Sequence, residues 1–412
     1  MPATNAATSR RLWATPYFVT LFAMLSLQVS NLGFSPLVPA IQREFALSFS
    51  QVGLFAGMYG LISVFTSIPA GLAIRQAGEK TALTGGLVVA ALGLAWLGLA
   101  ESTPAAFGAR ALWLSGYRFA FIAVMTAIAL SCPPSIRGRS MGVLGAISAF
   151  ASVVGAPMGS VVARDFGWRQ SMFAYAAVAV AGAVVFASCY RVRGPAAGVD
   201  STAETISAGS PFRSFIVWGV ALLSGFSGVT SLTTNTFLPS ALNSVFRLNA
   251  VDAASMISTA FACAIVLNLS FGFLMDRCNR SMVMGGVALL LMTGSLLMLS
   301  RELATFRVGA ILVLALGHAA IQQSYALAAD VLRGRETGNV MGIVGGVAGV
   351  VNYLTPQALG ILRDRTGNFD AGWCLLAAIS GLTFLLVIVL HLRFGLMSRF
   401  GGALTLTGSR ES

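Results

Sequence analysis

The chain has 412 residues, of which 56% are hydrophobic and only 10% are charged, and its formal net charge at pH 7 is +12. Soluble domains carry about 25% charged residues, so this composition excludes an ordinary water-soluble fold. The basic residues stand in short stretches between apolar runs, not along a stripe with interleaved aromatic residues, so nucleic acid is not an expected partner. Composition therefore predicts a protein whose partner is the lipid bilayer.

Residues that commonly carry enzyme or metal chemistry are sparse. The five cysteines are scattered and form no CxxC pair, and the two histidines belong to no HExxH motif. The sequence has no Walker-type GxxxxGK[ST] motif, so ATP hydrolysis is not expected to drive the protein. We therefore predict that the chain is not an enzyme and uses no metal or cofactor.

Apolar runs of about twenty residues, each long enough to cross a bilayer, recur along almost the whole chain. The first six predicted spans are 17–40, 50–74, 81–100, 105–131, 141–163 and 171–190. A polar stretch at 191–213, rich in Gly, Ala, Ser and Pro, predicts a flexible linker. Six more spans are predicted at 214–238, 251–275, 281–300, 304–330, 339–362 and 371–392.

The distribution of basic residues predicts the orientation in the membrane. Of the 26 Lys and Arg residues, sixteen fall on the side of the two termini and nine, among them Arg110, on the opposite side, while Arg118 lies within a span. Because cytoplasmic loops carry the excess of Lys and Arg, both termini are expected to be cytoplasmic. We expect a multi-pass protein of the cell membrane, specifically a bacterial inner membrane, that acts as a monomer.

Two segments indicate that the halves of the chain are homologous. SIRGRSMGVLGA (135–146) and VLRGRETGNVMGIVGG (331–346) share an RGR turn followed by a Met-Gly pair. Pro157 and Pro356 follow at nearly the same distance, where each can bend a helix for gating. Duplicated halves are typical of transporters. The pattern predicts an all-α polytopic fold with 12 transmembrane helices in two pseudo-symmetric six-helix bundles. The predicted divisions are bundles at 1–190 and 214–394, a cytoplasmic linker at 191–213 and a cytoplasmic tail at 395–412.

The loop between the eighth and ninth spans, GFLMDRCNRS (272–281), resembles a motif of the major facilitator superfamily of secondary transporters, roughly G-x-L-A-D-R-x-G-R-K. The residues on motif positions include Gly272, Asp276, Arg277 and Arg280. The loop between the second and third spans, GLAIRQAGEK (71–80), keeps Gly71 and Gly78, but Arg75 stands where the motif has its acidic residue. The resemblance implies that these residues take part in gating.

The same resemblance implies alternating access, in which two six-helix bundles rock around one central substrate site. A stretch after the fifth span, DFGWRQSMF (165–173), is similar to one common in the superfamily. The sequence GAPMG (155–159) resembles part of the fifth-helix signature of its drug antiporters.

Two ionisable side chains stand near the middle of predicted spans, Arg118 in the fourth and His318 in the tenth, whereas all fourteen acidic residues fall in loops or near helix ends. Counted from the RGR turns, their positions differ by four residues, about one helical turn, so they are expected on corresponding faces. A guanidinium binds a carboxylate through two parallel hydrogen bonds, so Arg118 is predicted to bind an anionic substrate. The alternative for Arg118 is a structural role, in which its guanidinium binds backbone carbonyls within the bundle. The alternative for His318 is a hydrogen bond to a neighbouring helix.

Further polar side chains are predicted at similar depth and are candidates to line the same site. They are Gln28, Asn31, Tyr117, Asn235, Gln322 and Asn352. For each of them the alternative is an interhelical hydrogen bond, worth about 0.6 kcal/mol.

The expected function is proton-coupled uptake of a small, carboxylate-like organic anion. Importing a monoanion against an inside-negative potential costs about 2.3 kcal/mol per 100 mV, and a co-transported proton makes the cycle electroneutral. His318 is the one group near mid-membrane that titrates near neutrality, so it is predicted to carry or sense the proton. The alternatives are a multidrug or metabolite exporter working as a proton antiporter, an anion exchanger, and a non-transporting membrane sensor on the same scaffold.

Overall fold

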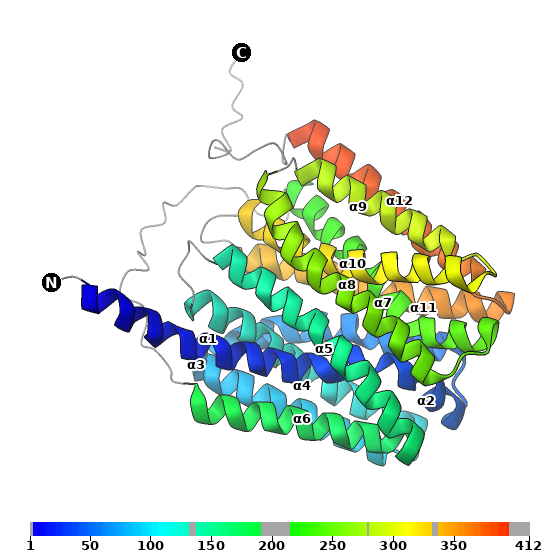
Figure 1. Ribbon diagram of the computed structural model, residues 1–412, viewed down its shortest axis with the longest axis horizontal. Helices are drawn as coiled ribbons and strands as arrows, with labels where there is room; N and C mark the ends of the chain where they lie inside the picture. Colours follow the sequence, from blue (N-terminus) through cyan, green and yellow to red (C-terminus); the bar gives the residue numbers. More distant parts are fainter. Residues whose placement is uncertain (1–2, 132–136, 191–214, 278–279, 332–336, 395–412) are drawn as a thin grey trace.

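The computed structural model describes residues 3–131, 137–190, 215–277, 280–331 and 337–394. Within these ranges every element of regular secondary structure is a helix (Figure 1). The predicted linker (191–213) and tail (395–412) lie outside the described residues, so both stay predictions.

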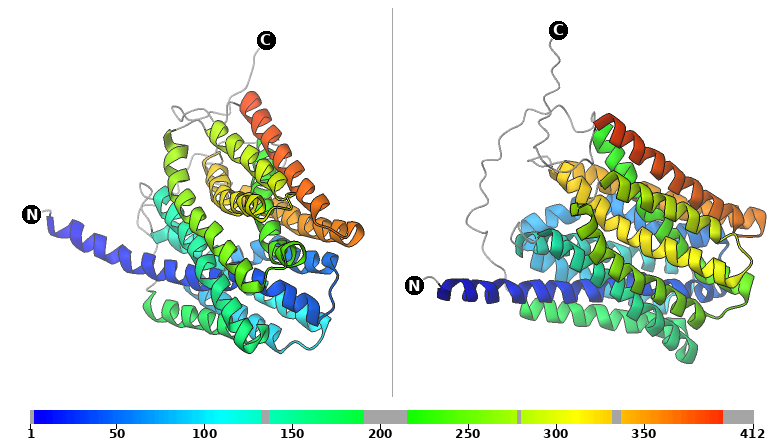
Figure 2. Two further views of the ribbon diagram at one scale, coloured as in Figure 1. Left: turned by 45° about the vertical axis from the view of Figure 1, so that its right-hand side comes forward. Right: turned by 45° about the horizontal axis from the view of Figure 1, so that its top comes forward.

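The helices form two bundles, one from each half of the chain (Figures 1 and 2). The N-terminal half contains α1 (Ala3–Gly33), the 3-10 helix η1 (Ser35–Leu37), α2 (Val38–Glu44), α3 (Phe49–Leu99), α4 (Thr103–Ser131), α5 (Arg137–Phe166) and α6 (Trp168–Cys189). The C-terminal half contains α7 (Phe215–Phe246), α8 (Ala250–Arg277), α9 (Arg280–Leu297), α10 (Leu303–Val331), α11 (Thr337–Thr366) and α12 (Asp370–Phe394).

Each predicted span coincides with helical structure, with two local differences. The first span is divided into α1, η1 and α2, and Pro36 and Pro39 stand in the first turns of the two short helices, where a missing N–H is tolerated. The second and third spans both lie in α3, which is interrupted at Gly78, where φ is 79° and ψ is 161°. Essentially only glycine adopts this backbone conformation, so Gly78 supplies the turn between the two spans.

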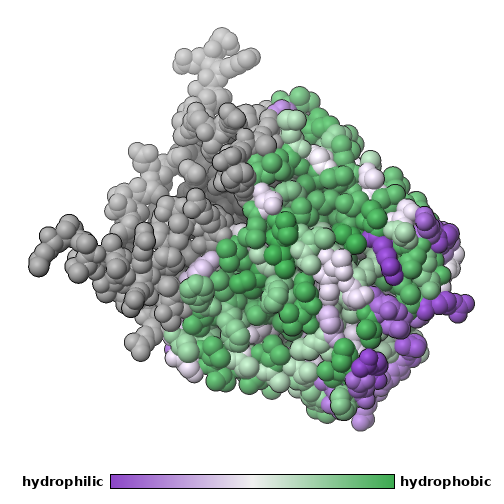
Figure 3. All heavy atoms as spheres, viewed as in Figure 1, coloured by the Kyte–Doolittle hydropathy of each residue, from purple (hydrophilic) through white to green (hydrophobic). Residues whose placement is uncertain are grey.

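The outer surface is suited to lipid. Figure 3 shows a described surface that is mostly hydrophobic, with hydrophilic residues gathered at the end where α2 lies, hereafter the α2 end. Large apolar side chains such as Phe18, Phe65 and Leu392 are exposed. In the described part of the chain, eight helical segments are long and apolar enough to cross a membrane. The fold is therefore that of a polytopic membrane protein.

The two bundles meet most closely along α3 and α11. A Cβ atom on Gly53 would overlap the carbonyl oxygen of Pro356, and one on Gly60 would overlap that of Gly349. Such small residues let helix backbones approach each other. Gly346 lies one turn from Gly349 on the same face of α11, yet a Cβ atom there would meet no atom within 4 Å. The helices α3 and α11 are therefore in close contact at the α2 end, and this close approach ends beyond Gly349.

Pro157 has a specific consequence in α5. A proline lacks the N–H group that would bond to the carbonyl of Val153, four residues earlier. That carbonyl accepts a hydrogen bond from the hydroxyl of Ser258 on α8, in the opposite bundle, at 3.3 Å. Pro157 thus frees a backbone acceptor that joins the two bundles.

Candidate substrate site between the two bundles

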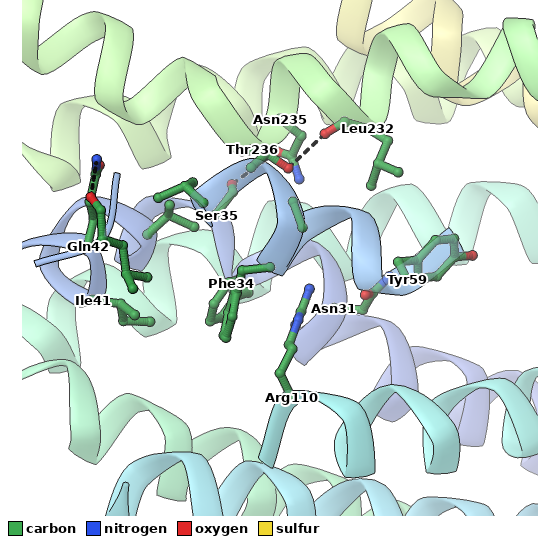
Figure 4. A pocket seen from close by; sticks show the side chains of 15 residues that line it. Asn31, Phe34, Ser35, Ile41, Gln42, Tyr59, Arg110, Leu232, Asn235 and Thr236 are labelled. Carbon is green, nitrogen blue, oxygen red and sulfur yellow. Dashed lines mark hydrogen bonds between the residues drawn. The ribbon is translucent and has the colours of Figure 1, made fainter. Parts of the chain in front are cut away.

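A pocket lies between the bundles near the α2 end (Figure 4). The N-terminal bundle contributes residues of α1, η1, α2, α3 and α4 to its lining, and the C-terminal bundle contributes residues of α7. The polar and charged lining residues are Asn31, Ser35, Gln42, Tyr59, Arg110, Asn235 and Thr236. Among the described residues that line it there is no carboxylate. A pocket with one guanidinium and several neutral hydrogen-bonding groups favours an anionic ligand.

The sequence analysis counts Arg110 with the side of the membrane opposite the termini, and the structure adds that this residue is buried. It lies within α4, and only 5% of its surface is exposed. Its guanidinium carbon lies 4.1 Å from the ring centroid of Trp113, 4.6 Å from that of Phe34 and 5.3 Å from that of Phe55. Cation–π contacts with these rings therefore replace part of the hydration of the charge.

Arg118, the predicted anion anchor, is also buried in α4, with 7% of its surface exposed. Its Nη1 donates to the hydroxyl of Tyr59 on α3 at 3.4 Å. Its guanidinium carbon lies 5.6 Å from the ring centroids of Tyr59 and Phe121. Because Tyr59 also lines the pocket, one side chain connects Arg118 with the pocket beside Arg110.

Two of the predicted substrate ligands, Asn31 of α1 and Asn235 of α7, line the pocket from opposite bundles. The Oδ1 atom of Asn235 accepts the hydroxyl of Ser35 at 3.0 Å, which joins η1 to α7. Since this oxygen is engaged, the amide N–H₂ of Asn235 is the group that a ligand in the pocket would meet.

Gln28 and Tyr117, predicted as further ligands, bind each other inside the N-terminal bundle and do not line the pocket. The Tyr117 hydroxyl donates to Gln28 Oε1 at 2.6 Å. Gln28 Nε2 donates to the hydroxyl of Ser148, also at 2.6 Å. Both polar groups therefore join α1, α4 and α5, which is the interhelical role considered as their alternative.

His318 is buried in α10, with 6% of its surface exposed. Its ring makes an edge contact with Phe261 of α8, with the centroids 5.1 Å apart, and it interacts with the backbone of Gly145 on α5. Its Nε2 atom is buried without a hydrogen-bond partner. His318 therefore stands at a second contact between the bundles, outside the lining of the pocket.

The remaining predicted residues are less fully described. Asn352 lies in α11, and its Oδ1 atom is buried without a hydrogen-bond partner. Gln322 lies in α10, but its side chain lies outside the described set. The side chains of Arg75, Asp276, Arg277 and Arg280, and the burial of Gly71 and Gly272, also lie outside the described set.

The stretch at 165–173 fixes one wall of the pocket. The indole N–H of Trp168 donates to the carboxylate of Glu44, the last residue of α2. Arg169 forms an ion pair with Glu44, with Nη2 and Oε1 2.6 Å apart, and its Nη1 donates to the carbonyl of Ala100 at 2.6 Å. These bonds hold α2 against α3 and α6, and α2 supplies lining residues of the pocket.

Known proteins resemble this chain in sequence and in fold. The family model described as Major Facilitator Superfamily matches residues 17–267 and 220–396. A probable sulfoacetate transporter, SauU, from Cupriavidus necator is 21% identical over 378 residues, which are 86% of this chain and 88% of the relative.

Solved structures share the fold at low identity. A bacterial homolog of the human lysosomal transporter Spinster, in an inward-facing and occupied conformation, has a TM-score of 0.76 and 13% identity. The match covers 96% of this chain and 99% of that one. The human organic anion transporter MFSD10 (TETRAN) has a TM-score of 0.68 and 14% identity, over 92% of this chain and 99% of its own. Together with the family match over most of the sequence, these findings show that the chain belongs to the Major Facilitator Superfamily of membrane transporters, which are not enzymes.

Proposed function

We propose that this protein takes up a small organic anion together with a proton, by alternating access of the two bundles to one central site. That the chain is a membrane transporter follows from its family. The anionic, carboxylate-like substrate, the direction of transport and the proton are our proposal.

The main observation in favour of an anionic substrate is the pair of buried arginines on α4. Both arginines are buried, Arg110 lines the pocket between the bundles, and Arg118 contacts Tyr59, which lines the same pocket. A guanidinium presents donors in a planar fork that matches a carboxylate or a sulfonate. Buried charges of this kind in membrane proteins commonly mark a substrate path.

Two relatives support the same substrate class. The name of the Cupriavidus necator relative gives sulfoacetate, a small organic anion, as its probable substrate. The human protein that shares the fold is named an organic anion transporter. For the present chain we therefore infer a carboxylate or sulfonate substrate.

Each predicted site residue has a role in this proposal. Arg118 anchors the anion, while Asn31 and Asn235 add neutral hydrogen bonds from opposite bundles. His318 carries or senses the proton, because an imidazole is the group that titrates near neutral pH. Further roles are assigned to Asn352 and Gln322 as lining residues, and to Gln28 and Tyr117 as residues that hold α4 in place.

Gating and orientation complete the proposal. The residues proposed to control closure at the end opposite α2 are Gly71, Arg75, Gly78, Gly272, Asp276, Arg277 and Arg280. Pro157 and Pro356 are proposed to allow helix bending. The excess of basic residues on the side of the termini supports cytoplasmic termini in a bacterial inner membrane, and we propose a monomer.

A second candidate is a multidrug or metabolite exporter. The sequence GAPMG in α5, which resembles part of the drug-antiporter signature, favours it. The pocket lining speaks against a cationic drug, since the one ionised group among its described residues is a guanidinium. Anion exchange would use the same arginines without a proton.

A thermal-shift screen of the purified protein tests the substrate class. A true ligand stabilises the protein in proportion to its occupancy. We expect sulfoacetate and succinate to raise the unfolding temperature in a saturable manner, and glucose and ethidium to leave it unchanged. Stabilisation by ethidium with no response to either anion would favour the exporter and refute the proposal.

A further inference from the structure

The surroundings of Arg110 leave part of its hydrogen-bonding capacity unused. The Nε and Nη1 atoms of Arg110 are buried and have no hydrogen-bond partner. The indole Nε1 of Trp113, the ring closest to the guanidinium, is also buried without one. A buried donor without an acceptor costs about 1–3 kcal/mol, and more when it is charged. Three such donors on two neighbouring side chains indicate a place where an acceptor binds.

Aromatic packing does not account for these donors. The rings of Phe34, Phe55 and Trp113 lie against the guanidinium, but the two phenyl rings carry no nitrogen or oxygen acceptor and the indole N–H of Trp113 is itself a donor. The N–H groups of a guanidinium lie in its plane and point outward from its edge. Figure 4 shows the Arg110 side chain extending from α4 towards the pocket, between Phe34 and Asn31. The edge is thus the part that can meet a ligand.

The pocket offers a ligand at Arg110 contacts from both bundles. Asn235, whose amide N–H₂ remains available, lines it from α7, and Asn31 lines it from α1. The described lining residues include no carboxylate that could neutralise Arg110. A small oxyanion held by a guanidinium on one side and amide groups on the other satisfies these donors.

Arg110 lines the pocket itself, whereas Arg118 contacts it only through Tyr59. Eight residues along α4 correspond to a rise of about 12 Å and a rotation of about 80° beyond two full turns, so the two arginines point in different directions. Arg110 is the one nearer the α2 end, and Tyr59 lies between the pocket and Arg118. Arg118 is not among the residues that line the pocket, so a ligand held there by Arg110 occupies a different place from one held by Arg118.

We propose that Arg110, with Asn235, forms a second oxyanion site that takes a carboxylate or sulfonate group at the α2 end of the substrate path. The inference that an oxyanion binds there depends only on the residues of the pocket. Its place on the path rests on the proposed function, with Arg110 receiving the anion before it reaches Arg118.

Tryptophan fluorescence of the full-length purified protein, titrated with sulfoacetate, tests this site directly because Trp113 lies against Arg110. Acetamide serves as the uncharged control solute. The variants are Arg118→Gln, Arg110→Gln and Trp113→Phe, and the matched control is Arg307→Gln, which removes an exposed positive charge from α10. Unfolding temperatures establish that each variant is folded, and Arg110→Lys replaces Arg110→Gln if the latter is not.

We expect Arg118→Gln to keep a saturable fluorescence change and Trp113→Phe to lose it. Arg110→Gln should weaken the apparent affinity about tenfold to a hundredfold, the size of effect expected for lost hydrogen bonds to a charged group. Arg110→Lys should weaken it less, and Arg307→Gln should match the parent. No saturable change in Arg118→Gln, or an unchanged affinity in the Arg110 variant, would overturn the second site.

Transport assays distinguish a failure of the second site from a failure of the proposed function. If the parent protein transports the anion but the Arg110 variant binds and transports normally, the second site is wrong and the function stands. If sulfoacetate binds at Arg110 but no organic anion is transported, the site stands and the proposed function fails.

Discussion

The carboxylate of Asp364, in the last turn of α11, accepts a hydrogen bond from the backbone N–H of Ser50, in the first turn of α3, at 2.8 Å. Its other oxygen accepts the N–H of Phe49 at 2.9 Å. The first N–H groups of a helix have no partner inside it, and a negative charge there also interacts favourably with the helix dipole. Since α3 and α11 belong to opposite bundles, Asp364 forms a cross-bundle cap at the α2 end.

The corresponding residue in the other half does not repeat this contact. Asp165 stands eight residues after Pro157, as Asp364 stands eight residues after Pro356. Asp165 instead pairs with its neighbour Arg164 at 2.7 Å on the surface. The first turn of α8 is capped by its own chain. The cross-bundle cap is therefore specific to α3 and α11, and Asp165 is a natural control for it.

Replacing Asp364 with alanine should loosen the α2 end. Loss of a helix cap costs about 1 kcal/mol, which corresponds to a shift of about fivefold in an opening equilibrium. We expect the first turn of α3 to exchange amide hydrogens about fivefold faster in Asp364→Ala, as measured by hydrogen–deuterium exchange mass spectrometry. Asp165→Ala should leave that segment unchanged. Equal exchange of the α3 segment in both variants would contradict the role of the cap.

The same cap should respond to acid. Partial burial raises the pKa of Asp364, but hydrogen bonds from Ser50, Phe49 and Ser48 outweigh it, so the net pKa lies below its ordinary value. A carboxylate whose pKa is lowered in the folded state stabilises that state at pH values above its ordinary pKa, and the stabilisation is lost as the pH falls through the lowered value. The difference in unfolding temperature between the parent and Asp364→Ala should therefore be constant at neutral pH and shrink in strong acid. A difference that grows on acidification would contradict this sign.

The glycine contacts predict a steric effect at the same interface. Gly60→Ala places a methyl group against the backbone of Gly349, which cannot move aside as a flexible side chain can. We expect the unfolding free energy to fall by about 1–3 kcal/mol, the usual cost of overpacking, together with slower transport. Gly346→Ala, on α11 where a Cβ atom meets nothing within 4 Å, is the matched control. If both variants behaved alike, close contact between α3 and α11 would not matter for stability.

Proton coupling predicts a change in the pH profile of transport. If His318 carries or senses the proton, His318→Gln should flatten the pH dependence of anion uptake into proteoliposomes, because glutamine does not titrate. His391→Gln, which removes the other histidine near the end of α12, should leave the profile unchanged. A His318→Gln profile that matches the parent would exclude this residue from coupling.

Local patterns predict most of the fold, because a membrane span is a property of one apolar run. Even the turn at Gly78 stands at a glycine of the predicted 71–80 loop. Arg110 was missed because an arginine seven residues into a helix has the same local pattern whether it is interfacial or buried. Trp113, three residues on, is the one local signal, whereas Phe34 and Phe55 reach Arg110 from other helices.

Long-range contacts explain the rest of what the sequence could not provide. Asp364 and Ser50 are 314 positions apart, and nothing in the spacing from the prolines distinguishes Asp364 from Asp165. Gln28 and Tyr117 carry the polar groups expected of ligands, yet they satisfy each other once α1 and α4 pack together. The position of a polar residue along an apolar run predicts its depth in the membrane, but only the packing of the helices determines its hydrogen-bond partner.

Uptake of a labelled small organic anion into proteoliposomes tests the central claim most directly, with the parent, Arg118→Gln and the control Arg307→Gln compared at equal reconstitution. The proposal predicts saturable, proton-gradient-dependent uptake by the parent and by Arg307→Gln. It predicts loss of uptake in Arg118→Gln while the unfolding temperature shows that this variant is folded. Undiminished uptake by Arg118→Gln, or uptake of cationic drugs with no uptake of carboxylates or sulfonates by the parent, would contradict it.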